Sequence, residues 1–145
     1  MQIAVGILEK FNSLKEGKVY YGEFARDTSL HAAVVITMHN DRLNCYCISS
    51  SKSFIDSVSK YDEKAVVRVS DLLVDRIFSE QHKESWIYCG KANLKKISRK
   101  DFLDMLSKGS ISFREEVSDN FLAELKDAVR NSVTYSKKDL EELGL

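Results

Sequence analysis

The chain has no proline and only 6 glycines among its 145 residues. Because these two residue types mark most turns and linkers, few positions announce a boundary between secondary-structure elements. The sequence also has no internal repeat, no low-complexity tract and no linker-like stretch. These absences argue against several domains joined by flexible segments and favour one compact domain over residues 1–145.

Net charge is absent as well, since 22 lysines and arginines balance 22 aspartates and glutamates. A neutral chain has no overall positive field to attract duplex nucleic acid, although a local phosphate site is compatible with it. Basic residues nevertheless outnumber acidic ones between residues 91 and 108. This segment is either a phosphate-facing surface or the solvated face of a helix. Its basic residues are Lys91, Lys95, Lys96, Arg99, Lys100 and Lys108.

Cysteines and histidines are few. The 3 cysteines are an odd number, and Cys45 and Cys47 are one residue apart, a spacing that does not favour a bridge between them. No CxxC motif occurs, and His31, His39 and His82 are scattered, so we expect no metal site. Residues 1–17 lack the features of a secretion signal, and their apolar run is too short to span a bilayer. The sequence therefore predicts a cytoplasmic protein with no membrane partner.

Motifs of several enzyme classes are missing too. The sequence contains no GxGxxG, GxxxxGK[ST], GxSxG or HExxH pattern. Dinucleotide-binding enzymes, P-loop nucleotidases, α/β-hydrolases and zinc proteases are therefore not expected. We expect no cofactor, so any chemistry has to come from individual polar side chains.

What is present is a change of hydrophobic period along the chain. Helical spacing predicts an N-terminal helix over residues 1–16, and a β-rich segment follows over residues 17–97. Further helical patterns fill residues 98–145, with Ser98 and Ser118 as expected caps. Within the β-rich part the expected strands cover residues 18–25, 31–38, 43–49, 64–70, 85–90 and 93–98, a short helix follows residue 51, and residues 71–78 fit a helix or a strand.

Strands grouped together and followed by helices predict an α+β domain with a small antiparallel sheet or SH3-like barrel. The strands at 31–38 and 43–49 form an expected hairpin, because the turn between them carries Asn40 and Asp41. In such a hairpin the first residue of one strand lies near the last residue of the other. We therefore expect His31 to lie close to Ser49 and Ser50.

The run Ser49-Ser50-Ser51-Lys52 at the end of a strand is the strongest candidate site. Hydroxyl groups and backbone N–H groups donate hydrogen bonds to phosphate oxygens, and Lys52 adds a positive charge. A helix that begins near Ser51 would add the partial positive charge of its N-terminus. The alternative is a capped helix start with solvent-exposed serines.

Residues of the first two strands could complete such a site. His31 is either a catalyst or a packing residue at a strand start. Tyr20, Tyr21 and Arg26 belong to the preceding strand and loop, so they could line the same edge. The tyrosines either bind RNA or belong to the core of the sheet.

These residues resemble the MazF/PemK/Kid group of toxin endoribonucleases from toxin–antitoxin systems. Residues 17–20, "GKVY", are similar to the family's first strand, residues 48–50, "ISS", to a strand end of the I-T-S type, and residues 85–89, "SWIYC", to a later strand. The resemblance extends over residues 17–133. The run at residues 49–52 is also similar to the T-S-x-K pattern of the ToxN/AbiQ-like ribonucleases, which share the fold.

The chain departs from the family in the loop before the second strand. The E-Q-x-G-x-R-P pattern is missing, and His31 stands at the place of the family's catalytic arginine, with Arg26 five residues upstream.

The resemblance implies metal-free cleavage of single-stranded RNA, in which a 2′-hydroxyl attacks the adjacent phosphate and leaves a 2′,3′-cyclic phosphate. His31 would be the general base or acid, with Arg26 as the nearest arginine. Lys52, Ser49 and Ser50 would stabilise the negative charge on the phosphorane, while a tyrosine of the first strand and Ser51 would bind RNA. The expected partners are single-stranded RNA, a cognate antitoxin of protein or RNA, and a second copy of the chain.

Two other functions remain open. A toxin of the same fold could act without catalysis, like the CcdB-type gyrase poisons, by binding a protein with its C-terminal helices around residues 121–145. An α+β adaptor, such as a phage or defence protein, could resemble the family by accident. If the chain forms a dimer, the exposed aliphatic side chains expected near Leu72, Val74 and Ile77 would form its interface.

Overall fold

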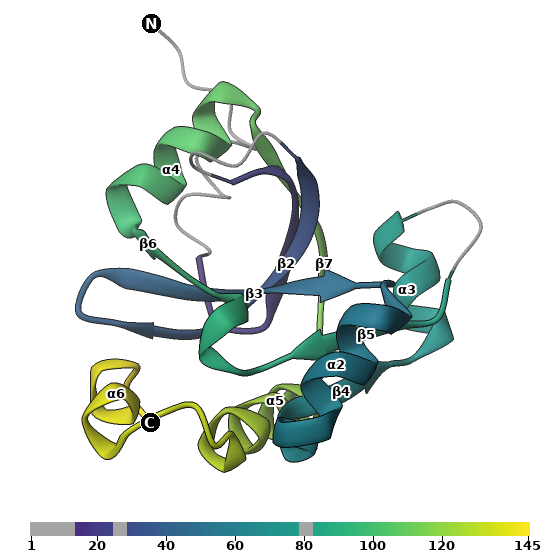
Figure 1. The fold of residues 1–145 in the computed structure, drawn as a ribbon. Helices are drawn as coiled ribbons and strands as arrows, with labels where there is room; N and C mark the ends of the chain where they lie inside the picture. Colours follow the sequence, from purple (N-terminus) through teal and green to yellow (C-terminus); the bar gives the residue numbers. More distant parts are fainter. Residues whose placement is uncertain (1–13, 25–28, 79–82) are drawn as a thin grey trace, which may run out of the picture.

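The computed structural model describes residues 14–24, 29–78 and 83–145 and confirms an α+β protein built on an antiparallel sheet (Figure 1). The predicted N-terminal helix falls almost entirely outside these residues. The strands are β1 (Lys18–Glu23), β2 (Leu30–His39), β3 (Arg42–Ser49), β4 (Val66–Val69), β5 (Ser85–Tyr88), β6 (Leu94–Ser98) and β7 (Ile111–Glu116).

Strand β3 organises the seven-stranded sheet, whose order is β4-β5-β3-β2-β1-β7 with β6 also paired to β3. One edge of β3 pairs with β2. Its other edge is shared, because β6 pairs with residues 42–46 and β5 with Ile48 and Ser49. The chain therefore bends between β5 and β6, where the 3₁₀ helix η2 (Lys91–Asn93) lies. This bend separates the two strands that the sequence predicts at 85–90 and 93–98.

The β2–β3 hairpin turns at Asn40 and Asp41, whose φ angles are 52° and 61°. Two successive left-handed residues form the turn that matches the twist of a hairpin, and asparagine and aspartate tolerate this backbone better than most residues. The hairpin predicted from the sequence is thus confirmed, and its register places Ala32 opposite Ile48.

The helices begin at hydroxyl-bearing residues. Ser51, Ser98 and Ser118 each accept a hydrogen bond from a backbone N–H of the first turn, which satisfies one of the donors left open at a helix start. The helices are α2 (Lys52–Asp62), α3 (Asp71–Phe78), α4 (Arg99–Lys108), α5 (Asp119–Asn131) and α6 (Lys137–Glu142), and the 3₁₀ helix η1 (Glu63–Ala65) follows α2. No helix of the described ranges is long and apolar enough to cross a membrane.

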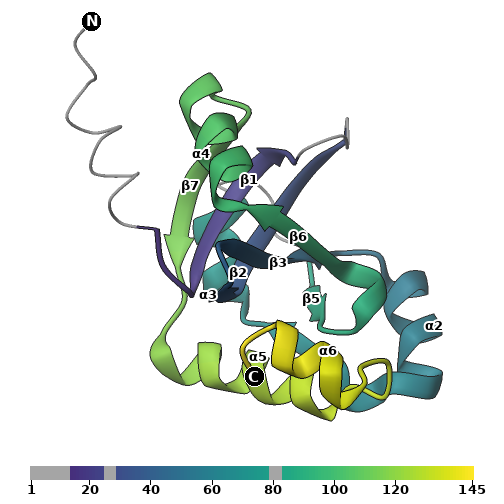
Figure 2. The ribbon, with the colours of Figure 1, turned by 90° about the vertical axis from the view of Figure 1, so that its left-hand side faces the viewer.

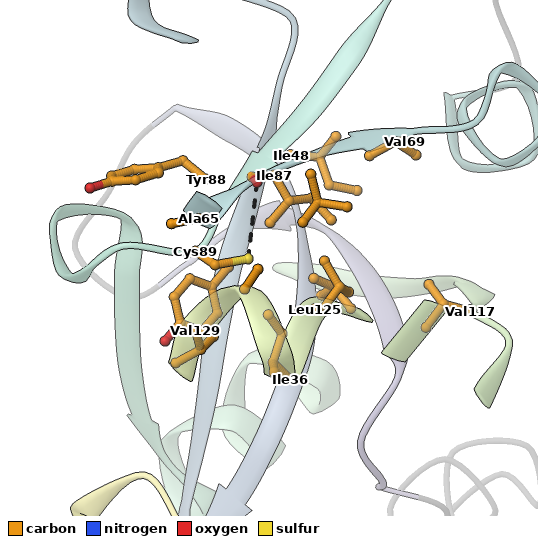
Figure 3. Packing of buried hydrophobic residues seen from close by; sticks show 14 of the residues in the cluster. Ile36, Ile48, Ala65, Val69, Ile87, Tyr88, Cys89, Val117, Leu125 and Val129 are labelled. Carbon is orange, nitrogen blue, oxygen red and sulfur yellow. Dashed lines mark hydrogen bonds between the residues drawn. The ribbon is translucent and has the colours of Figure 1, made fainter. Parts of the chain in front are cut away.

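Helices cover both faces of the sheet, as Figure 2 shows for α4 on one side and α5 with α6 on the other. One buried cluster joins Val34 and Ile36 to Leu125 of α5, and part of it appears in Figure 3. The other joins Ala33 and Val35 to Phe102 of α4. Successive residues of β2 are therefore buried on opposite faces, which explains the continuous apolar run from Ala32 to Ile36.

Three features of the structure correct the sequence prediction or settle a point that it left open. Residues 98–145 are not only helical, because β7 lies within them and pairs with β1. The ambiguous segment 71–78 is the helix α3. Of the aliphatic residues expected for a dimer, Val74 and Ile77 are in the core, so only Leu72 is exposed. These two residues were wrongly assigned to the surface because only one face of α3 points to solvent.

Candidate functional site

A hollow of about 250 Å³ opens where β2 begins and β3 ends, and His31 and Ser49 both line it. The pairing of Ala32 with Ile48 brings the two strand ends together. Since side chains alternate along a strand, His31 and Ser49 lie on the same face as Ala33 and Cys47. The predicted proximity of His31 and Ser49 is confirmed.

The opposite wall of the hollow comes from the bend between β5 and β6. Asn93 and Lys95 line it. Asn93 was not a candidate on sequence grounds, and Lys95 was one of six basic residues in the segment 91–108. The side-chain amide of Asn93 donates to the carbonyl oxygens of Cys47 at 3.0 Å and Tyr88 at 2.8 Å, which ties the bend to β3 and β5. In the sequence, only the excess of basic residues over 91–108 pointed to Lys95. That excess does not show which lysine faces the hollow.

Lys95 reaches the hollow through the register of β6. It pairs with Cys45, so both side chains lie on the face that carries Cys47. Burial raises the pKa of the Cys45 thiol, a charge on Cys47 would raise it further, and Lys95 opposes these two effects. The thiol of Cys45 is therefore protonated at neutral pH and is not a nucleophile.

The serine run starts helix α2. The Phe54 N–H donates to Ser51 Oγ at 3.4 Å, and the Ser51 N–H donates to Ser49 Oγ at 3.1 Å. Ser50 and Lys52 are exposed and are not among the residues that line the hollow. The capped helix start that the sequence left open is thus present, and of the serine–lysine run only Ser49 faces the hollow.

Replacing Ser51 with alanine should lower the free energy of unfolding by about 0.5–2 kcal/mol, because the first turn of α2 loses its cap. Ser51→Asp should change it by less than about 0.5 kcal/mol, since aspartate caps equally well. Chemical denaturation monitored by circular dichroism measures both. Exposed Ser50→Ala is the control, and an equal loss in Ser50→Ala and Ser51→Ala would contradict a capping role.

The tyrosines of β1 do not line this hollow. Tyr20 is 2% exposed, and its ring packs edge-to-face on Phe102 with centroids 4.9 Å apart. Burial, followed by the nearby Cys45 and Glu116, raises the pKa of Tyr20 to about 12. The prediction that Tyr20 stacks an RNA base is therefore wrong, because its ring is buried against Phe102 of α4.

Tyr21 points to the other face of the sheet, since its register partner is Ala32 rather than Ala33. The Arg114 guanidinium lies over its ring at 4.7 Å from the centroid. Tyr21 is thus separated by the sheet from His31. Arg26 lies outside the described residues.

Neither the models of known protein families nor the curated proteins compared with the chain give a match. Over the ranges 14–24, 29–78 and 83–145, no group of three or more His, Cys, Asp or Glu residues is close enough to hold a metal ion.

A second, larger hollow of about 440 Å³ lies between α3 and the start of α5. Its apolar part includes Phe121 and Leu72, and Leu72 is 63% exposed. Arginine and glutamate side chains also line this hollow: Arg68, Arg76, Glu116 and Glu124. A mixture of exposed apolar groups and charges of both signs suits a surface that binds a protein.

Proposed function

We propose that the protein is a metal-independent endoribonuclease that cleaves single-stranded RNA, and that it acts as the toxin of a toxin–antitoxin system in the cytoplasm. The supporting observation is the gathering of an imidazole, a hydroxyl and an ammonium group, from His31, Ser49 and Lys95, around one hollow. The resemblance to the MazF/PemK/Kid group adds the toxin role and the antitoxin partner.

The reaction needs a base, an acid and donors for the phosphate oxygens. The base removes the proton of the 2′-hydroxyl, whose oxygen attacks phosphorus while the bond to the 5′-oxygen breaks. An acid returns a proton to that leaving oxygen. His31 serves one of these proton transfers, since imidazole exchanges protons near neutral pH.

Stabilisation of the negative charge on the non-bridging oxygens of the phosphorane is the second requirement. Lys95 and the Ser49 hydroxyl would supply it, a contribution that is commonly the largest in such reactions. Exposed Ser50 and Lys52 follow Ser49 along the chain, so they are suited to the phosphate of a neighbouring nucleotide rather than to the reacting one.

The test is incubation of the purified protein with a single-stranded RNA in EDTA. We expect a product with a 2′,3′-cyclic phosphate and a product with a free 5′-hydroxyl, identified by mass spectrometry. The same oligonucleotide with 2′-deoxynucleotides throughout should remain intact, because it lacks the attacking group. Intact RNA, or cleavage of the deoxy substrate, would reject the reaction.

A non-catalytic, protein-binding toxin is the second candidate, and the hollow at Leu72 and Phe121 favours it. The two functions separate in a growth-arrest assay after expression in bacteria. A nuclease loses toxicity in His31→Ala and keeps it in Leu72→Arg. A protein-binding toxin shows the reverse.

A further inference from the structure

A phenylalanine stands at the wall of the hollow with much of its ring exposed. Phe54 lines the hollow together with His31, Ser49 and Lys95, and it is 37% exposed. We propose that the hollow is a subsite for one unpaired nucleotide, in which Phe54 stacks the base and Lys95 contacts a phosphate. This proposal rests on the proposed function and names the residues that hold its substrate.

The ring of Phe54 is supported by a buried tyrosine. It packs edge-to-face on Tyr88 with centroids 6.0 Å apart and planes at 73°. Tyr88 is itself fully buried and donates to the carboxylate of Asp62 at 2.7 Å. Phe54 therefore rests on a rigid support, so its side chain would lose little conformational entropy when a base stacks on it.

The phosphate-binding group lies on a different element. Lys95 is on β6 and Phe54 on α2, and both line the hollow. Asn93 holds the bend before β6 in place through its bonds to Cys47 and Tyr88. A flat apolar surface and a cation around one cavity match the two parts of a nucleotide, the base and the phosphate.

The small size of the hollow limits what it can bind, and one nucleotide is the unit proposed for it. Its volume of about 250 Å³ is slightly below the range of roughly 300–1,000 Å³ that is usual for ligand pockets. A base can enter it only when it is unstacked and unpaired, which selects single-stranded over duplex RNA.

The experiment measures binding of a fluorescent single-stranded oligonucleotide with 2′-O-methyl groups, which cannot undergo the attack, by anisotropy in EDTA. Phe54→Ala should weaken binding about 5- to 150-fold, the usual effect of removing one stacking platform. Phe54→Leu keeps an apolar side chain against Tyr88 and should still weaken binding, whereas Phe54→Trp should retain it.

Phe113 offers a matched control. It is also 37% exposed, and it packs edge-to-face on Tyr20 with centroids 6.0 Å apart, but it lies on β7 and outside the hollow. Phe113→Ala should bind the oligonucleotide like the wild type. Thermal denaturation of all variants shows whether each remains folded under the binding conditions.

Lys95 is tested by the salt dependence of the same binding. Lys95→Gln should reduce the slope of log K against log salt concentration by about 0.7, the value for one phosphate contact on a single strand. The control is Lys96→Gln, the next residue along β6, whose side chain pairs with Glu142 at 3.8 Å. This variant should leave the slope unchanged.

The outcomes distinguish the subsite from the reaction. Binding that depends on Phe54 and Lys95 without any RNA cleavage keeps the subsite and rejects the nuclease. Cleavage by the wild type with equal binding by Phe54→Ala and Phe113→Ala rejects the subsite and keeps the nuclease. A wild-type protein that neither binds nor cleaves rejects both.

Discussion

His31→Ala should lower the rate of RNA cleavage by about 100- to 10,000-fold, the usual contribution of one general acid or base. The free energy of unfolding should change little in comparison, because His31 is half-buried at the second residue of β2 rather than in the core. Single-turnover cleavage of a short RNA measures the chemical step directly. A loss of this size without unfolding would distinguish a catalytic residue from a packing residue.

His39→Ala is the control for this variant, because His39 is exposed at the other end of the same strand. It should cleave RNA at the wild-type rate. The pH dependence gives a second readout, since one limb of the wild-type profile should disappear in His31→Ala. A parallel loss of activity in both variants, or an unchanged profile in His31→Ala, would reject a proton-transfer role.

Local sequence signals predicted the elements that bring His31 and Ser49 together. The apolar run of β2, the turn at Asn40 and Asp41, and the β3 strand that follows define a hairpin without knowledge of the rest of the fold. The helix caps at Ser98 and Ser118 are equally local. For this reason the hairpin and these helix starts were predicted at the right residues.

The other half of the hollow depends on contacts between segments distant in the chain. Lys95 faces His31 only because β6 pairs with β3 in one register, and a shift of one residue would place Lys96 there instead. Phe54 lines the hollow because α2 packs back toward β5. Neither arrangement has a local signal, so the sequence favoured Lys52, which is next to the serines but outside the hollow.

The strand β1 shows why alternation alone misassigned a residue. Tyr20 and Tyr21 were both candidates because their strand precedes His31 and could line the same edge of the sheet. In the structure α4 covers the Tyr20 face, and Arg114 covers the ring of Tyr21. Strand β7 was missed for a different reason: it is a mostly exposed edge strand rich in charged residues, so it has no apolar run to reveal it.

Asp62→Ala should destabilise the protein by about 3–5 kcal/mol, because two donors on buried residues and one part-buried backbone N–H lose their acceptor, and each unsatisfied buried donor costs about 1–3 kcal/mol. Asp62 is 2% exposed. Its carboxylate accepts from Tyr88 Oη at 2.7 Å, from Ser132 Oγ at 2.6 Å and from the Val133 N–H at 2.9 Å. Burial, together with the hydrogen bond to Asp62, raises the pKa of Tyr88, so this tyrosine stays a donor at neutral pH.

The same carboxylate joins three distant segments, so its loss should have a local signature. Ser132 and Val133 begin the C-terminal segment that ends in α6, and Tyr88 supports the ring of Phe54. Hydrogen exchange of residues 132–145 should therefore accelerate in Asp62→Ala. Oligonucleotide binding should weaken as well, although Asp62 itself does not line the hollow.

Asp56→Ala is the matched control, because Asp56 lies on the same helix and is exposed. Denaturant unfolding should show a change of less than about 0.5 kcal/mol for it, as is usual for a surface substitution. Ser132→Ala should fall between the two variants, since it removes one donor and leaves the carboxylate bonded to Tyr88 and Val133. Equal stability of Asp62→Ala and Asp56→Ala would mean that the carboxylate does not hold the C-terminal segment to the sheet.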